Sequence, residues 1–152
     1  MSTATSADEP ETVLLDTSAA VALIVEDHEA HARVMATVGG RRLGLAGHAL
    51  FETYSVLTRL PGGRRRSPTD ALRLLRHNFS ASVFLGEEQA RDLAAELARL
   101  DLSGGAVYDG LVAAAARQHG HRLVTADVRA RSLYEALGVE IELVRPSFTA
   151  TD

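Results

Sequence analysis

Short apolar segments that alternate with longer helical segments limit the fold of this chain more than any other feature. Five segments have the composition of strands, at residues 12–15, 43–46, 82–85, 122–125 and 139–144. They are short and mostly apolar, which is typical of parallel strands buried on both faces of a sheet. Strands separated by helices predict an α/β layered fold with a mostly parallel sheet.

Helices are expected between these strands, at residues 17–26, 28–38, 48–60, 68–77, 87–100, 106–118 and 128–137. One clear start signal is Ser67 as N-cap directly before Pro68. The 152 residues suit one domain and contain no repeat or dividing linker. We therefore predict a single domain over residues 11–146, a disordered N-terminal tail at 1–10 and a C-terminal tail at 147–152.

Composition excludes several classes of chemistry. The chain has no Cys, which removes disulfides, thiolate nucleophiles and Cys-based metal sites. All 16 cationic side chains are Arg, so every mechanism that needs a Lys amine is excluded. The net charge of −4 means that a polyanion must be held by a local Arg patch or a metal ion. The longest apolar run, residues 19–25, is too short to span a bilayer, and a cytoplasmic location is expected.

Four acids are predicted to lie at the edge of the sheet where the strands end. Asp16 directly follows the first strand, and Asp127 follows the fourth strand by two residues. Glu52 lies about one turn into the helix after the second strand, and Asp109 about one turn into the helix that leads into the fourth. The first turns of both helices fall at this edge, which is where α/β folds bind ligands.

Each acid also has an explanation that involves no function. Asp16 and Asp127 precede helices, where Asp is a favoured N-cap. Glu52 shares a helical face with His48, as a solvated residue would. Asp109 lies on a helix that is apolar nearly all round, where a buried Arg would have to pair with it. The convergence of the four acids, and no single one of them, points to a site.

Carboxylates gathered in one place repel and raise one another's pKa values, and a divalent cation relieves this repulsion. All-oxygen ligands without Cys or clustered His favour Mg²⁺ or Mn²⁺ over zinc. One or two such ions suit phosphoryl transfer, because they bind phosphate oxygens, acidify water and stabilise developing charge.

The four acids lie in four short motifs that occur in a fixed order along residues 11–145. The motifs are Val13-Leu14-Leu15-Asp16-Thr17-Ser18-Ala19, Phe51-Glu52-Thr53-Tyr54, Tyr108-Asp109-Gly110-Leu111-Val112-Ala113-Ala114 and Leu123-Val124-Thr125-Ala126-Asp127. Each motif is weak alone, but all four in this order resemble the PIN-domain ribonucleases. More narrowly, the chain is similar to the VapC toxins of bacterial toxin–antitoxin pairs.

This resemblance implies a PIN-like three-layer sandwich with a central parallel sheet in the order 3-2-1-4-5. It also implies a Mg²⁺- or Mn²⁺-dependent endoribonuclease that hydrolyses RNA with a metal-activated water and leaves 5′-phosphate and 3′-hydroxyl ends. Asp16, Glu52, Asp109 and Asp127 map onto the acidic quartet of the family. Asp16 and Asp109 would be the main metal ligands, and the other two acids would bind directly or through water.

The resemblance assigns further residues and partners. Thr17, Ser18 and Thr125 fall where the family places hydroxyls that help to order the metal shell. The family also implies homodimers and a cognate VapB antitoxin that blocks the active-site groove, so DNA would be contacted only through the antitoxin. Transfer, ribosomal and messenger RNA all stay open as substrates.

One Arg-rich segment is the candidate contact for RNA phosphates, although a solvated surface loop would have the same composition. Its residues are Arg59, Arg64, Arg65 and Arg66. The glycines before Arg64 suggest a mobile loop that could grip a substrate or a partner.

Rival classes of protein fit less well. A phosphatase of the haloacid-dehalogenase type needs an Asp where the chain has Ser18, and it needs a Lys, as does a receiver domain. A Rossmann enzyme needs a glycine-rich turn in place of the residues after the first strand. The alternative that stays open is a catalytically inactive PIN-fold module that binds RNA or protein.

Overall fold

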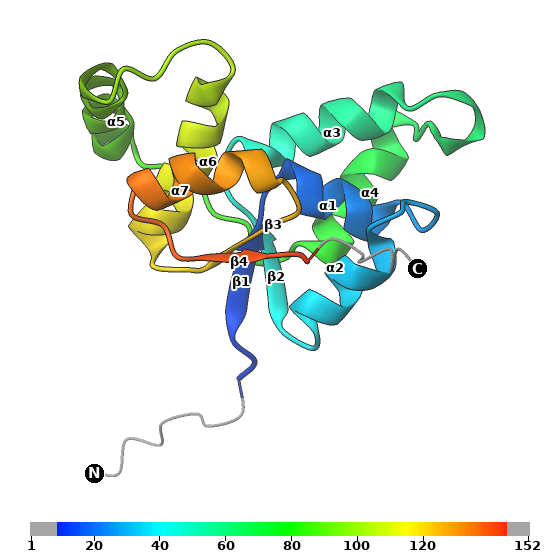
Figure 1. Ribbon diagram of the computed structural model, residues 1–152. Helices are drawn as coiled ribbons and strands as arrows, with labels where there is room; N and C mark the ends of the chain where they lie inside the picture. Colours follow the sequence, from blue (N-terminus) through cyan, green and yellow to red (C-terminus); the bar gives the residue numbers. More distant parts are fainter. Residues whose placement is uncertain (1–8, 146–152) are drawn as a thin grey trace, which may run out of the picture.

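The computed structural model describes residues 9–145 (Figure 1). The predicted tails lie outside these residues, apart from residues 9 and 10. Within the described range, four parallel strands form one sheet in the order β2-β1-β3-β4. The strands are β1 (Thr12–Leu15), β2 (Arg42–Leu45), β3 (Leu123–Thr125) and β4 (Ile141–Leu143).

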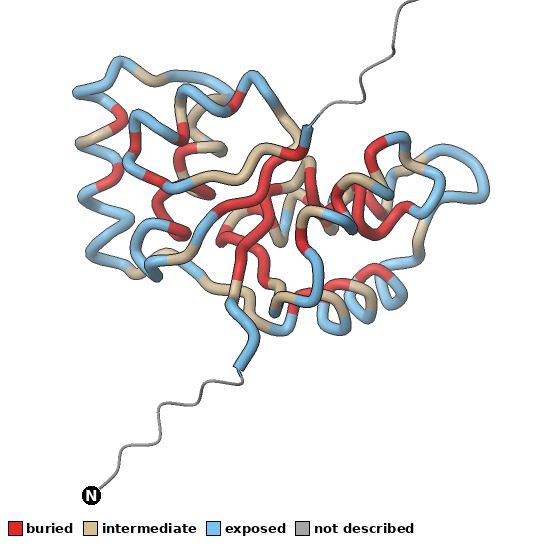
Figure 2. The backbone as a smooth tube through the Cα atoms, turned by 60° about the horizontal axis from the view of Figure 1, so that its bottom comes forward, coloured by how far each residue is buried: buried red, intermediate tan, exposed pale blue. Residues whose placement is uncertain are grey.

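The central strand β1 carries apolar side chains on both faces, because both faces of the sheet are covered there. Val13 and Leu15 pack into the core on one face of the sheet, and Leu14 packs into the core on the other. All three side chains are fully buried, and Figure 2 shows buried backbone running through the middle of the molecule. The sheet is thus the middle layer of a three-layer sandwich, as predicted.

Helices form the two outer layers (Figure 1). One layer contains α1 (Thr17–Ile24), α2 (His31–Val38), α3 (Ala49–Arg59) and α4 (Pro68–Asn78). The opposite layer contains α6 (Ala106–His119) and α7 (Arg131–Ala136). The remaining helix α5 (Glu87–Arg99) packs on α6 through Leu93 and Leu97. No helix in the described part of the chain is long and apolar enough to cross a membrane.

The prediction of a full strand at residues 82–85 is wrong. Val83 forms only an isolated parallel bridge with Ala46, beside β2, where the order 3-2-1-4-5 places it. Backbone bonds join Ala81 to Leu43 and Val83 to Leu45. Between them, the Leu45 N–H donates to the Ser82 hydroxyl at 2.9 Å. Because a side chain takes this donor, the parallel hydrogen-bond ladder is interrupted at that point.

Two predicted helices lose three or more residues relative to their expected ranges. Residues 28–30 form a turn, in which the Ala30 N–H donates to His28 Nδ1 at 3.0 Å, and α2 begins only at His31. The segment 128–137 divides into a 3₁₀ turn, η2 (Val128–Ala130), and the α-helix α7. The Asp127 carboxylate caps η2 by accepting from the Arg129 N–H at 3.0 Å.

Candidate active site

The sheet brings the four predicted acids to one edge. Asp16 follows β1, Asp127 follows β3, and Glu52 and Asp109 lie in the first turns of α3 and α6. Their proximity is visible in the pKa of Asp109, which is raised to about 6. Burial is the largest cause, and the negative charges of Asp16, Glu52 and Asp127 add to it.

Asp16 is the most deeply buried of these four acids, with 4% of the residue exposed. One oxygen, Oδ1, accepts from the Ser18 hydroxyl at 2.6 Å and from the Ala19 N–H at 3.0 Å. The other, Oδ2, accepts from the Tyr134 hydroxyl at 2.9 Å. Asp16 is therefore also the N-cap of α1. Burial raises the pKa of Asp16, and hydrogen bonds, that of Ser18 foremost, oppose this shift.

Glu52 is held at only one of its two oxygens. Its Oε2 accepts from the Thr17 hydroxyl at 3.2 Å. Its Oε1 is buried and has no hydrogen-bond partner among the described residues. His48 Nε2 lies 3.4 Å from that oxygen, close enough for attraction when the imidazole is protonated, but without the geometry of a hydrogen bond. A buried, unpaired carboxylate oxygen is costly and suits a site that accepts a ligand.

The three predicted hydroxyl residues contact Asp16, Glu52 and Asp127, and none of them contacts Asp109 through a hydrogen bond in residues 9–145. Besides its bond to Asp16, the Ser18 hydroxyl lies 3.4 Å from the Thr125 hydroxyl and accepts from the Ala126 N–H at 3.0 Å. Thr125 Oγ1 accepts from the Asp127 N–H at 3.1 Å. These bonds tie the end of β3 to the start of α1, so they fix how Asp127 lies relative to Asp16.

Asp109 is half-buried and makes no salt bridge with an Arg in residues 9–145, so the pairing expected of a structural carboxylate is absent there. Its neighbours on α6, from Val112 to Ala116, are buried in the core. In the same range no three carboxylate or imidazole groups are clustered tightly enough to hold one metal ion. The acids share an edge, but separate partners hold Asp16, Glu52 and Asp127 in place.

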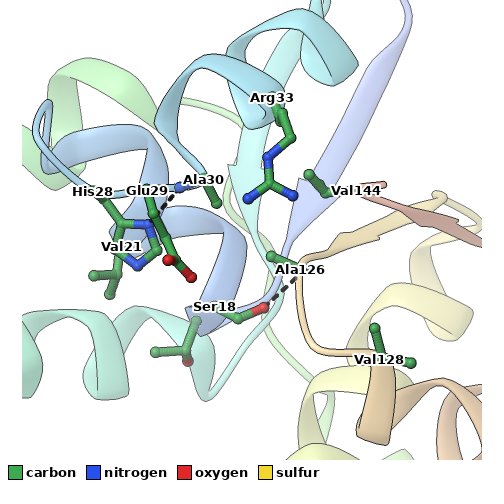
Figure 3. Close-up of a pocket in the computed structure, with 10 residues that line it drawn as sticks. Ser18, Val21, His28, Glu29, Ala30, Arg33, Ala126, Val128 and Val144 are labelled. Atoms are coloured by element: carbon green, nitrogen blue, oxygen red, sulfur yellow. Dashed lines mark hydrogen bonds between the residues drawn. The ribbon is translucent and has the colours of Figure 1, made fainter. Parts of the chain in front are cut away.

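A cleft of about 350 Å³ is lined by chain neighbours of Asp16 and Asp127, although by none of the four acids themselves (Figure 3). Thr17 and Ser18 line it where α1 begins, and Val21, Val128 and Val144 make part of its wall apolar. Figure 3 shows Arg33 reaching from α2 into the cleft, on the side away from Ser18.

Arg33 is the only Arg among the described residues that line the cleft. Its Nη1 donates to the Arg145 carbonyl at 2.7 Å. No carboxylate in the described part of the chain forms a salt bridge with it.

The structure does not bring the Arg-rich segment to the acids. Arg64 lies with Asp27 near the C-terminal end of α1, and its Nη2 is 2.6 Å from the Asp27 carboxylate. Arg59 ends α3. Asp16 and Glu52 lie at the opposite ends of the same helices. The 8 residues of α1 span about 12 Å, and the 11 of α3 about 16 Å.

Four residues at or beside the site were not among the sequence candidates: Arg33, His48, Tyr108 and Tyr134. The helical spacing of four residues placed His48 on the face of Glu52, which was a usable signal. Arg33 and Tyr134 reach the site only through the packing of α2 and α7, which no spacing along the chain indicates. Tyr108 adjoins Asp109 in the chain, and its ring stacks on His48 with centroids 5.0 Å apart.

Comparison with known proteins identifies the family that has this arrangement. The PIN domain family matches residues 13–136, which include all four acids. This chain belongs to the PIN-domain family. It is 49% identical over 127 residues to Ribonuclease VapC27 of Mycobacterium tuberculosis, and the match covers 84% of this chain and 93% of that protein. Within the family it is a VapC-type ribonuclease, the toxin of a VapBC toxin–antitoxin system.

Solved structures agree on the fold of this VapC-type chain. The Mycobacterium tuberculosis toxin VapC20, described as cleaving the sarcin–ricin loop, has a TM-score of 0.64 and 21% identity, over 88% of this chain and 99% of that one. DNA-bound VapBC from Salmonella typhimurium has a TM-score of 0.62 and 21% identity, over 89% and 99%. Among the structures with this fold are therefore complexes of a toxin with its antitoxin.

Proposed function

We propose that this VapC-type ribonuclease is a Mg²⁺- or Mn²⁺-dependent endoribonuclease whose active site is the edge formed by the four acids. Asp16 and Asp109 act as the main metal ligands, and Glu52 and Asp127 bind directly or through water. The observation that carries this proposal is the placement of the four acids at one edge of the sheet, where burial and the three other carboxylates raise the pKa of Asp109 to about 6. Such a cluster of negative charge is costly in itself and suits a hard cation.

The residues present fit a hard ion in the chemistry of their oxygens, although no three of them in residues 9–145 lie close enough to share one ion without moving. Every candidate ligand is a carboxylate oxygen, which is what Mg²⁺ and Mn²⁺ prefer. Glu52 Oε1 is buried and unpaired among the described residues, so an oxygen is available that the protein itself does not satisfy. When bound, the ion supplies a Lewis acid that acidifies water and offsets the charge of a phosphodiester.

The chain's own groups orient the reaction. Ser18 and Tyr134 hold one oxygen each of the Asp16 carboxylate, so its direction is set before any ligand arrives. Thr17 holds one oxygen of Glu52 and leaves the other free to accept a proton or a ligand. A carboxylate of this group takes one proton of the attacking water as the water oxygen bonds to phosphorus and the bond from phosphorus to the 3′-oxygen breaks. The 3′-oxygen then takes a proton from solvent, which gives 5′-phosphate and 3′-hydroxyl ends.

The same proposal includes partners. The RNA substrate, a VapB-like antitoxin and a second copy of the chain in a homodimer are expected from membership of the VapC group. The cleft that Arg33 lines begins at Thr17 and Ser18, directly after Asp16, which suits both a substrate strand and a blocking segment.

A cleavage assay tests this function. Purified protein is incubated with total cellular RNA in Mn²⁺ or Mg²⁺, and the 5′ ends of the products are sequenced. We expect defined cuts that EDTA abolishes and that fresh Mn²⁺ restores. Equal cleavage in EDTA would contradict the metal requirement. Binding of RNA without any cleavage would instead support the inactive PIN-fold module.

The Arg-rich segment gives a weaker prediction about RNA affinity. Replacing Arg64, Arg65 and Arg66 by Gln should flatten the dependence of RNA binding on salt, by about 0.7 in log–log slope for each RNA phosphate that the segment neutralises. Arg64 already pairs with Asp27, so we expect the segment to neutralise fewer phosphates than it has arginines. Fluorescence anisotropy from low to high salt measures the slope. An unchanged slope would show that the segment is an ordinary solvated loop.

A further inference from the structure

Tyr108 is a large aromatic residue that the fold leaves 52% exposed, one residue before Asp109 in the first turn of α6. Its ring stacks on the imidazole of His48, with the centroids 5.0 Å apart and the planes inclined by 16°. Because one face of the ring lies against His48, a second flat group would have to stack on the opposite face. A ring held in this way loses little freedom when a second flat group stacks on it.

The stack is directly connected to the proposed active site. His48 Nε2 lies 3.4 Å from Glu52 Oε1, and Glu52 is joined to α1 through the Thr17 hydroxyl. The Tyr108 ring is therefore separated from a carboxylate of the acidic edge by a single imidazole. A nucleotide whose phosphate lies at the acids could place its base on this ring.

We propose that the face of the Tyr108 ring opposite His48 stacks on the base of a nucleotide adjacent to the cleaved phosphodiester of single-stranded RNA. This inference rests on the proposed ribonuclease function and adds a substrate subsite to it. Unstacked bases of single-stranded RNA are bound in this way by aromatic side chains, with little preference for one base. The subsite therefore holds the strand in place and contributes little to the choice of sequence.

Kinetics on a single-stranded RNA with one cleavage site test the subsite. Tyr108→Leu keeps an apolar side chain and removes the ring, and should raise KM about tenfold while kcat changes less than twofold. Tyr108→Phe keeps the ring and should cleave like the wild type. Phe84→Leu is the matched control, because Phe84 is 50% exposed and pairs with Phe51 instead of His48. Its KM should not change.

Abasic RNAs locate the base that stacks. Removing one base next to the cleaved bond should raise KM for the wild type by about the same factor as Tyr108→Leu. The same RNA should give no further rise in KM with Tyr108→Leu, since both changes remove the same stacking interaction. Additive effects at every position would overturn the subsite.

Two other results would also overturn it. Unchanged KM with Tyr108→Leu, while the wild type cleaves normally, would reject the subsite and leave the ribonuclease function intact. Conversion of a dimer to a monomer by Tyr108→Leu, seen by light scattering, would assign the ring to an interface between two copies. A wild-type protein that cleaves no RNA would instead reject the proposed function, so the two failures are distinguishable.

Discussion

The two sides of the acidic edge are built differently. On the side of β1 and α7, Asp16 is almost fully buried, and its oxygens accept from Ser18, Ala19 and Tyr134. On the side of α3 and α6, the acids are more exposed and have fewer partners. Glu52 has one oxygen unpaired among the described residues, and Asp109 has its pKa raised to about 6 by burial and by neighbouring charge.

This difference indicates that the carboxylates on the two sides have different roles. The carboxylate of Asp16 has its orientation fixed by the protein, at the cost of its burial. The carboxylate of Asp109 keeps unfavourable electrostatic energy that a cation would relieve, and Glu52 keeps a buried oxygen without a hydrogen bond among the described residues. A site that combines one preorganised ligand with less constrained ones can bind an ion strongly and still leave room for substrate oxygens.

The largest expected effect comes from Asp16→Asn. Asn keeps the N-cap of α1, so the variant should fold, but it removes the charge of the preorganised ligand. We expect RNA cleavage to fall more than a hundredfold, since loss of a mere partner of a metal ligand typically costs about 10- to 100-fold. Mn²⁺ affinity, measured by calorimetry, should fall with it. Normal cleavage by this variant would remove Asp16 from the mechanism.

Tyr134→Phe tests whether the orientation of Asp16 matters separately from its charge. The substitution keeps the buried ring and removes the hydroxyl that donates to Oδ2 at 2.9 Å. We expect kcat/KM for RNA and Mn²⁺ affinity both to fall about tenfold, as is usual for partners of ligands. Tyr54→Phe is the control, because Tyr54 packs against the opposite core. Equal activity of Tyr134→Phe and the wild type would show that Ser18 and Ala19 suffice.

The fold could be predicted where it depends on patterns along the chain. Four of the five expected strands form, because buried parallel strands are short and apolar. The remaining expected strand, at residues 82–85, is reduced to the bridge at Val83, because the Ser82 hydroxyl accepts a hydrogen bond from a backbone N–H of β2. That competition depends on the positions of two segments far apart in the sequence, so local pattern does not reveal it.

The candidate site shows the same limit. The ends of strands and the first turns of helices fix where Asp16 and Glu52 lie, and these positions follow from the order of elements. Tyr134 reaches Asp16 across 118 positions of the sequence, and Arg33 reaches the cleft from α2. Such contacts depend on how helices pack on the sheet, which their own sequences do not specify.

The smallest expected effect concerns the contribution of Asp109, on the side of α3 and α6, to the stability of the fold. In the unfolded chain, Asp109 loses its proton near its ordinary pKa of 3.8, whereas the folded chain keeps it until about pH 6. Protonation of Asp109 therefore stabilises the fold fully below about pH 4, and this contribution is lost as the pH rises through 6. At neutral pH the ionised carboxylate destabilises the metal-free protein.

Asp109→Asn should accordingly be inactive and yet more stable than the wild type at pH 8 in EDTA. The raised pKa corresponds to about 3 kcal/mol at most, and solvent screening of this half-buried group reduces the expected gain to about 1 kcal/mol. Urea unfolding at pH 8 and pH 4 measures it, and the gain should disappear at the lower pH. Glu88→Gln, at an exposed position in the first turn of α5, should show no such pH-dependent gain. A loss of stability with Asp109→Asn at pH 8 would mean that this carboxylate is structural, and the two sides of the edge would then be alike.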